Sequence, residues 1–312
     1  MKNKLVSIVL PAFNESGNIE IIKEKIEACF PFHQYDLEMI FVDDGSTDNT
    51  LEKIAGLSSS RFDIFHIELS RNFGHQNALK AGIDYANGHC IVSMDCDLQH
   101  PPEIIPAFLE KWEEGYDIVY TRRHESENLS YIKRKSSNLF YSFISWLSDI
   151  KIEKGTSDFR LIDRRVADVF TKFSENDLFI RGIMKWVGFR QVAIDFYPND
   201  RFSGQSKYSF RKMLRFAFNG ITSLSIRPLY TTVYLGFTLT LLSLLYLPYV
   251  LWSLYYSGHY VYGWSSVILT IVFFSGLQLC VLGIIGIYIG KMFMQVKDRP
   301  LYIVKSTNLK GK

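Results

Sequence analysis

The chain has 312 residues, 47% of them hydrophobic, and a formal net charge of +3 at neutral pH. Its four cysteines show neither the paired spacing of a zinc site nor the pattern of a secreted disulfide framework, which excludes those two classes. The basic excess is local to segments beside the apolar part of the chain, so we expect a membrane rather than a nucleic acid as partner. The distribution of the apolar residues along the chain therefore decides the broad class of protein.

Short β-rich runs alternate with helical patterns up to residue 121. The runs cover residues 5–10, 38–42, 63–69, 90–94 and 117–120. Pro102 suits a first helical position, and Gly88 and Gly115 suit helix ends. Strands that alternate with helices predict an α/β domain in which a mostly parallel sheet is covered on both faces. In such sheets, ligands bind beyond the carboxyl ends of the strands.

Three of the predicted strands end in polar clusters, at residues 11–15, 43–46 and 95–97. In the last cluster, Asp95 and Asp97 can hold a hard divalent cation, Mg²⁺ or Mn²⁺, through oxygen and leave coordination positions for a diphosphate. A solvated turn or a helix cap is the alternative for such a pair. Because the three clusters share one edge of the predicted sheet, we expect a single site there.

Asp43 and Asp44 supply carboxylates at a second strand end, where a ribose or the edge of a base can be hydrogen-bonded. The alternative is turn chemistry, with Thr47 or Asp48 capping the helix that follows. The chain has no Gly-x-Gly-x-x-Gly after its first strand and no Gly-Lys-Ser/Thr phosphate loop. A bound nucleotide would therefore be held largely through a metal ion.

Two long runs without Asp, Glu, Lys or Arg cover residues 229–256 and 264–290. Each exceeds the roughly 20 residues that a helix needs to cross a bilayer, so we predict two transmembrane helices; two buried helices of a soluble domain are the alternative. The connector 257–263 carries no Lys or Arg, whereas basic residues precede the first run and follow the second. The positive-inside rule then predicts a multi-pass protein of the inner (plasma) membrane, with both termini cytoplasmic and a basic cytosolic tail at 291–312.

Two segments ahead of the first apolar run have one apolar and one basic face, at residues 133–148 and 209–226. Basic amphipathic helices of this kind can lie in the membrane interface, and packing on the α/β core is the alternative. We therefore predict a cytosolic domain over residues 1–228 that carries two interfacial helices.

Five motifs in a fixed order, followed by two membrane helices, are typical of one family. They read VSIVLPAFNE, FVDDGSTDNT, MDCDLQHPPE, GTSDFRLIDR and DRFSGQSKYS. The chain resembles the polyprenyl-phosphate glycosyltransferases of inverting glycosyltransferase family 2, the group that contains dolichol-phosphate mannosyltransferase and bactoprenol glucosyltransferases. The resemblance spans nearly the whole chain and implies a GT-A type, Rossmann-like domain that binds a nucleotide sugar. Its motifs are specific for the family and only weakly specific for the sugar.

The resemblance also implies roles for residues at the matching positions. The nucleotide pocket would involve Pro11, Phe13, Glu15, Val42 and Asp44. The donor diphosphate and the metal ion would be bound by Asp95, Cys96 and Asp97, with Gln99 as a further metal ligand. Phosphate groups of donor and acceptor would be bound by Arg122, Arg201 and Lys207, with Arg134 and Arg160 as further candidates. Mannose-transferring members carry a small residue where this chain has Asp158, so Asp158 looks closer to the glucosyl-type members and would act as a base or a sugar-orienting group.

Together these expectations describe a metal-dependent, inverting hexosyltransferase that moves a sugar from a nucleotide donor to polyprenyl phosphate, such as undecaprenyl phosphate. A strong general base is not obligatory, because a phosphate monoester with a second pKa near 6 is already largely an anion at neutral pH. UDP-glucose is the favoured donor, ahead of UDP-linked amino sugars, UDP-linked 4-amino-arabinose derivatives and GDP-mannose.

Two other functions are the alternatives to this one. A processive polysaccharide synthase would carry a Gln-x-x-Arg-Trp segment and extra membrane helices, and the sequence has neither. A lipid-sugar translocator or a membrane scaffold would not need carboxylates at three strand ends. The oligomeric state stays open, with a homo-oligomer among the options.

Overall fold

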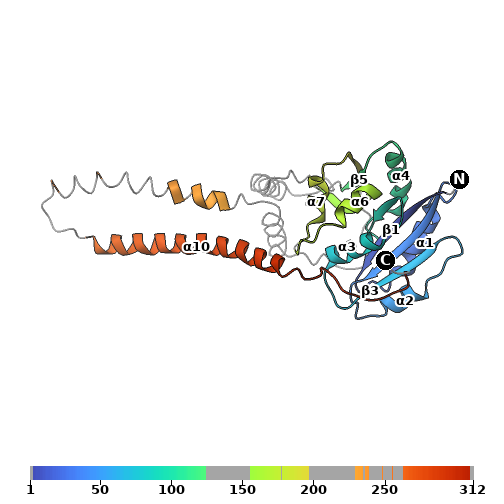
Figure 1. The fold of residues 1–312 in the computed structure, drawn as a ribbon, viewed down its shortest axis with the longest axis horizontal. Coiled ribbons are helices and arrows are strands. Elements are labelled where there is room, and N and C mark those ends of the chain that lie inside the picture. Colours follow the sequence, from blue (N-terminus) through green and yellow to red (C-terminus); the bar gives the residue numbers. More distant parts are fainter. Residues whose placement is uncertain are drawn as a thin grey trace, which may run out of the picture.

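The computed structural model describes residues 3–123, 155–176, 178–196, 229–234, 236–238, 248, 255 and 263–309. Most of these form an α/β domain and one long helix, α10 (Trp264–Val296), that extends away from the domain (Figure 1). The helices of the domain are α1 (Ile19–Cys29), α2 (Thr50–Gly56), α3 (His75–Tyr85), α4 (Ile105–Glu113), α6 (Arg164–Phe170) and α7 (Ile180–Trp186). The α/β class predicted from the alternating pattern is confirmed.

The domain is built on one eight-stranded sheet with the order β7-β5-β6-β4-β1-β2-β3-β8. The strands are β1 (Lys4–Ala12), β2 (Tyr35–Asp43), β3 (Asp63–Leu69), β4 (Cys90–Ser93), β5 (Ile118–Arg123), β6 (Thr156–Asp163), β7 (Gln191–Phe196) and β8 (Val304–Thr307). Strands β4, β1, β2 and β3 are parallel to one another, as predicted. Because β6 and β8 pair antiparallel with their neighbours, the sheet as a whole is mixed.

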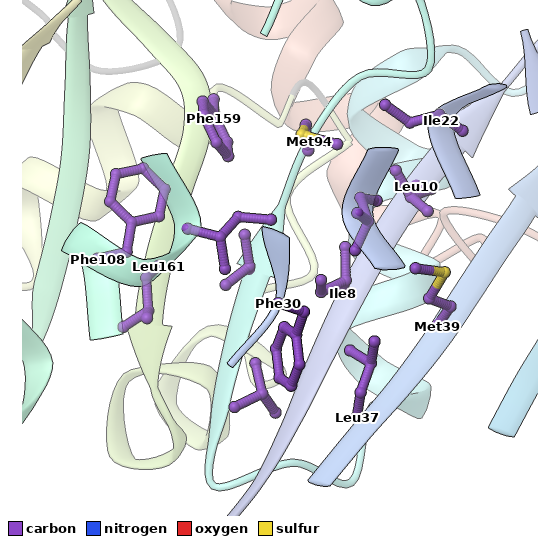
Figure 2. Packing of buried hydrophobic residues seen from close by; sticks show 14 of the residues in the cluster. Ile8, Leu10, Ile22, Phe30, Leu37, Met39, Met94, Phe108, Phe159 and Leu161 are labelled. Atoms are coloured by element: carbon purple, nitrogen blue, oxygen red, sulfur yellow. The ribbon is translucent and has the colours of Figure 1, made fainter. Parts of the chain in front are cut away.

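Both faces of the sheet are buried, because successive residues of a strand point to opposite sides. Ile8 and Leu10 of β1 pack with Met39 of β2 and with residues of α1 and α4 (Figure 2). Val9, between them in the sequence, joins the cluster on the other face, under α3, α6 and α7. All three side chains are fully buried, so β1 lies at the centre of the core and its carboxyl end is held rigidly.

The two glycines predicted at helix ends have different reasons for being glycine. Gly115 follows α4 with a φ of 87°, a left-handed conformation that favours glycine, so this helix end is confirmed. Gly88 lies against β1 instead, where an added Cβ would come within 2.5 Å of the backbone nitrogen of Ser7. A glycine is required here because the chain packs closely against β1 just before β4 begins. The prediction that Gly88 ends a helix was wrong.

Among the described residues, one helix is long and apolar enough to cross a membrane. It is the part of α10 from Phe273 to Val296, with a mean hydropathy of 1.9 and no buried residues in its apolar window. Helix α10 covers the second predicted span and continues to Val296, beyond the predicted end at residue 290. The first predicted span, 229–256, is described only in short pieces, and the segments 133–148 and 209–226 lie outside the described residues.

The segment after α10 returns to the sheet of the α/β domain. Strand β8 pairs antiparallel with β3, and the Ile303 carbonyl accepts a hydrogen bond of 2.9 Å from the Ser70 backbone N–H. Tyr302 donates its hydroxyl proton to Asp84 of α3 at 2.8 Å. We expected residues 291–312 to form only a basic tail, but their described part ends α10 and adds an edge strand to the sheet.

Candidate active site

The acidic residues that follow β1 and β4 lie close enough to influence one another. Glu15 is half-buried, and burial raises its pKa, with the negative charges of Asp97 and Asp95 raising it further. Two residues in the left-handed region turn the chain at these ends, Asn14 with a φ of 57° and Leu98 with a φ of 61°. The structure therefore brings the first and third predicted clusters together at one edge of the sheet.

This group of carboxylates fits a hard divalent cation. Asp95 has a third of its side chain exposed, and Asp97 has one oxygen engaged by the Gln99 backbone N–H at 3.1 Å. No set of three or more His, Cys, Asp and Glu side chains in the described ranges could hold an ion alone. Mg²⁺ is commonly bound by one or two carboxylates together with substrate phosphates, so Asp95 and Asp97 suit an ion that a diphosphate helps to coordinate.

The Asp43–Ser46 turn holds the start of α3 in place. Asp44 is almost fully buried and accepts backbone hydrogen bonds from Phe73 at 2.7 Å and Gly74 at 2.9 Å. Burial raises the pKa of Asp44 although these two bonds favour its ionised form. Gly45 has a φ of 68°, and a Cβ there would lie 2.6 Å from the backbone carbon of Arg71. The turn thus fixes the loop that leads into α3.

Two side chains at the start of α3 connect the strand-end carboxylates. The Nε2 atom of His75 lies 3.4 Å from Oδ1 of Asp95 and 3.9 Å from Oδ2 of Asp158 on β6. Gln76 donates to Oδ2 of Asp158 at 3.4 Å and accepts the Ile180 backbone N–H at 3.2 Å. Asp158 therefore belongs to the same site as the Asp95 pair.

Asp158 is a buried carboxylate held by two guanidinium groups. Arg181 of α7 donates from Nε to Oδ1 at 3.0 Å and from Nη2 to Oδ2 at 2.8 Å, a two-point contact. Arg160 of β6 adds a bond of 3.4 Å to Oδ1. Burial alone would raise the pKa of Asp158, but Arg181, Arg160 and His75 together hold it well below its usual range. Asp158 is therefore ionised and a poor proton acceptor in this arrangement.

Arg160 lies behind Asp158, with only 3% of the residue exposed. Its Nη2 also donates to the Ser157 carbonyl at 2.8 Å, and its Nε has no hydrogen-bond partner within the described part of the chain. Burial lowers its pKa to about 10, which still leaves the group charged. Arg160 thus neutralises the charge of Asp158 from the side of the core, and it does not reach a lipid phosphate in this geometry.

His100 fastens the Asp95 loop to β6. Its ring stacks on Phe159 with centroids 5.2 Å apart, and its Nε2 lies 2.8 Å from the Ser157 hydroxyl. The other ring nitrogen is 3.4 Å from the backbone nitrogen of Asp95. The loop with the two aspartates is therefore anchored to the strand that carries Asp158.

Comparisons with known proteins identify the family. Residues 7–170 match the model of glycosyl transferase family 2. YkcC of Bacillus subtilis, an uncharacterized glycosyltransferase, is 40% identical over 96% of this chain and 93% of its own. A prophage-derived bactoprenol glucosyl transferase of Shigella flexneri is 35% identical over 97% of this chain and 98% of its own. The chain belongs to glycosyl transferase family 2.

A solved structure, the mannosyl-3-phosphoglycerate synthase of Rubrobacter xylanophilus, is similar with a TM-score of 0.49 at 16% identity, and the similarity covers 70% of this chain and 72% of that one. Membership of the family rests on the sequence relatives. This family membership agrees with the mixed α/β sheet described above, so the fold is GT-A-like, as the resemblance implied.

Apart from Asp44 and Arg160, described above, the predicted site residues of this glycosyltransferase fall into three groups. At the strand-end edge lie Glu15, Asp95, Asp97 and Gln99, together with the exposed Phe13 and with Asp158. The side chains of Pro11, Val42 and Cys96 are buried, the last two within the apolar clusters. Arg122 makes a two-point contact with Asp195 of β7 at 2.6 and 3.0 Å, while Arg201, Lys207 and Arg134 lie outside the described residues.

Sequence reasoning missed His75, Gln76 and Arg181. The first two open α3 directly after Gly74, whose φ is 95°, and polar residues in that position are the available signal. Arg181 is one of many arginines in the sequence and sits in no recognised motif. Only the packing of α7 beside α3 and β6 shows its relation to Asp158.

Proposed function

We propose that this glycosyltransferase moves a sugar, glucose in the first instance, from a nucleotide sugar to a polyprenyl phosphate with inversion. UDP-glucose is the donor we favour. Support comes from relatives named bactoprenol glucosyl transferase, which align along nearly their whole length with this chain. Helix α10 supports a position at the membrane, where such a lipid acceptor resides. We further propose a multi-pass plasma-membrane protein with its active site on the cytoplasmic side.

The ion-paired state of Asp158 is the observation that carries the choice of acceptor. A sugar hydroxyl must lose its proton to attack, and a nearby carboxylate would serve as the base. Asp158 is bound by Arg181 and Arg160, which lower its affinity for a proton. A phosphate monoester, with a second pKa near 6, attacks as an anion and needs no such base. The geometry therefore favours a phosphate acceptor over a hydroxyl acceptor.

In this mechanism a phosphate oxygen of the acceptor forms a bond to the anomeric carbon while the bond to the nucleoside diphosphate breaks. The electron pair leaves with the diphosphate oxygen, and a single displacement inverts the anomeric centre. Asp95 and Asp97 would hold a divalent ion, Mg²⁺ or Mn²⁺, which when bound would supply charge stabilisation to the leaving diphosphate. Asp158 and His75 orient the sugar, the carboxylate as an acceptor of hydroxyl hydrogen bonds.

The acceptor phosphate needs cations close to the lipid surface. We propose Arg201 and Lys207 for this role, because their motif directly precedes the basic segment 209–226 and the first apolar run. Arg122 can contribute if its contact with Asp195 opens, since both side chains are partly exposed. Gln99 remains a proposed further metal ligand, and Phe13 and Glu15 remain proposed contacts of the nucleotide.

The test uses purified full-length protein with a panel of donors: UDP-glucose, UDP-linked amino sugars, UDP-linked 4-amino-arabinose and GDP-mannose. Each is incubated with undecaprenyl phosphate or with undecaprenol, the matched acceptor without phosphate. We expect nucleoside diphosphate release and a sugar–phosphate–lipid mass only with the phosphate, and a β-linkage from an α-linked donor. Equal turnover with undecaprenol would contradict the proposal.

A further inference from the structure

Helix α7 ends in an exposed tryptophan. Trp186, the last residue of α7, is 66% exposed, more than any other large apolar side chain in the described residues up to Phe196. Its ring packs edge-on against Phe173 with centroids 5.8 Å apart. Figure 1 shows α7 at the end of the domain nearest to α10. An aromatic pair in this position needs a partner that accepts apolar surface.

Three hydrogen bonds connect the neighbouring loop to the last turn of α10. The Gln295 side chain donates to the Ser174 carbonyl at 3.0 Å and accepts the Asn176 backbone N–H at 3.1 Å. The Asn176 side chain donates to the Met294 carbonyl at 2.7 Å. Because Ser174 directly follows Phe173, the aromatic pair lies within roughly 10 to 15 Å of this end of α10.

The end of α10 marks the level of the lipid headgroups if the helix crosses the bilayer, which is part of the function proposed above. The candidate membrane span ends at Val296, with Lys291 near this end, and Lys297, Asp298 and Arg299 follow. Phe173 and Trp186, tied to this turn through Ser174, then lie at the headgroup level as well. Tryptophan is enriched at this depth, since its ring is apolar and its N–H remains hydrogen-bonded.

The charge around the aromatic pair suits an anionic surface. Lys172 and Lys185 flank Phe173 and Trp186 in the sequence, and both are exposed. Lys297 and Arg299 add two positive charges at the end of α10, against Asp298 and the two acidic residues of the 172–186 sequence, Glu175 and Asp177. The surface is therefore net positive, and anionic lipid attracts basic residues placed beside a membrane helix.

We propose that Lys172, Phe173, Lys185 and Trp186 form a docking surface for the headgroup region of an anionic bilayer, separate from α10. Helix α7 carries both Trp186 at its end and Arg181, which holds Asp158. Docking of this helix sets the distance of the active site from the lipid phosphate. The inference rests on the membrane position proposed above and concerns a surface that the transfer reaction itself does not use.

A depth measurement tests the contact directly. In full-length protein with Cys29 and Cys280 replaced by serine, a cysteine at position 186 carries an environment-sensitive fluorophore, and the matched control carries it at Ser58, which follows α2 on the far side of the domain. Cys90 and Cys96 are buried and stay in place. In nanodiscs with anionic lipid, headgroup nitroxides should quench the label at 186 and leave the label at 58 bright. Equal quenching at both positions would overturn the proposal.

Kinetics separate this inference from the proposed function. Trp186→Glu should raise KM for undecaprenyl phosphate in anionic nanodiscs by roughly fivefold, the effect of about one charge at such a surface. Trp186→Phe should come close to wild type, and Ser58→Glu should have no effect. With a short, water-soluble prenyl phosphate all variants should match wild type. Loss of turnover of the soluble acceptor by wild-type protein would count against the proposed function, whereas an unchanged KM in Trp186→Glu would count against the docking surface alone.

Discussion

Arg181 and Asp158 form a two-point ion pair across two elements, with N–O distances of 3.0 and 2.8 Å. A third of the Arg181 side chain is exposed, whereas Asp158 is buried. The pair therefore closes the site from the side of α7, and Arg160 closes it from the side of the core. Removal of Asp158 would leave the buried Arg160 charge without its partner, so Arg181 is the better position at which to test the pair.

Arg181→Lys should reduce kcat by up to about 100-fold, because lysine keeps the charge but loses the planar two-point contact that fixes Asp158. Affinity for the nucleotide sugar should change much less. Arg165→Lys is the matched control, since Arg165 pairs with Asp163 and Asp117 at the other end of β6. Steady-state kinetics and donor calorimetry measure the two quantities. Wild-type kcat in Arg181→Lys would exclude a positioning role for the pair.

The acid limb of the pH profile should follow the acceptor and not Asp158. A carboxylate whose pKa is lower in the folded than in the unfolded protein stabilises the fold at pH values above its unfolded pKa, which is 3.8 for Asp158. This stabilisation is lost only as the pH falls below 3.8. Activity should instead decline below about pH 6, where the acceptor phosphate gains its second proton. A phosphonate acceptor with a higher second pKa should shift the limb upward. Identical limbs for the two acceptors would point to a group on the protein.

Asp97→Asn should lower turnover by at least about 100-fold while the protein still folds, because asparagine keeps the oxygen that accepts the Gln99 N–H but loses the charge that binds the ion. Asp36→Asn, on the exposed amino end of β2, is the control. Mn²⁺ binding in the presence of UDP, followed by electron paramagnetic resonance, gives a readout without activity. Full turnover of wild type in excess EDTA would refute metal dependence.

Tyr302→Phe should destabilise the folded protein by about 1 kcal/mol, since it removes the hydrogen bond to Asp84, which also pairs with the buried Lys80. Burial and the Asp84 charge raise the pKa of Tyr302 above its ordinary 10, so its neutral form is favoured in the fold. Stability should therefore fall as the pH rises above 10, and less steeply in Tyr302→Phe. Thermal unfolding between pH 8 and 11 measures both effects. An unchanged melting temperature would mean that the segment after α10 is not docked in solution.

Membrane topology can be tested with single cysteines at Ser306, in β8, and at His259, in the predicted external connector. An impermeant thiol reagent should label the cysteine at 259 in intact cells, and the one at 306 only after permeabilisation, because the basic residues lie on the Ser306 side. The native thiols are removed first. Labelling with the opposite preference would invert the proposed orientation.

The sequence predicted the elements whose signal is local. Strands β1 to β5 match the apolar runs to within a few residues, because buried parallel strands read as continuous apolar stretches. Strand β8 has the sequence VKST, which carries no such signal, and its pairing with β3 is a contact between distant parts of the chain. The same limit applies to the sheet as a whole, which was expected to be mostly parallel and is mixed.

The same difference between local signals and long-range contacts applies to the residues of the site. Asp95 and Asp97 could be found because their spacing is local, whereas two of the partners of Asp158, Arg181 and Gln76, lie 23 and 82 residues away from it. Motif membership also does not tell which way a side chain points. Cys96 lies between two site aspartates, yet its side chain is 1% exposed and belongs to the core. Burial raises the pKa of its thiol well above the ordinary value, so Cys96 is no candidate for thiol chemistry.

The return of the chain to β3 has a consequence for biosynthesis. Thr307 of β8 leaves the ribosome about 240 residues after its partner Ile67, and α10 is made in between. At ordinary elongation rates, the outer edge of β3 stays open for roughly 10 to 50 seconds. An unpaired strand edge is a template for aggregation during that time. Glu68 places a charge on this edge until Lys305 arrives to pair with it at 2.6 Å.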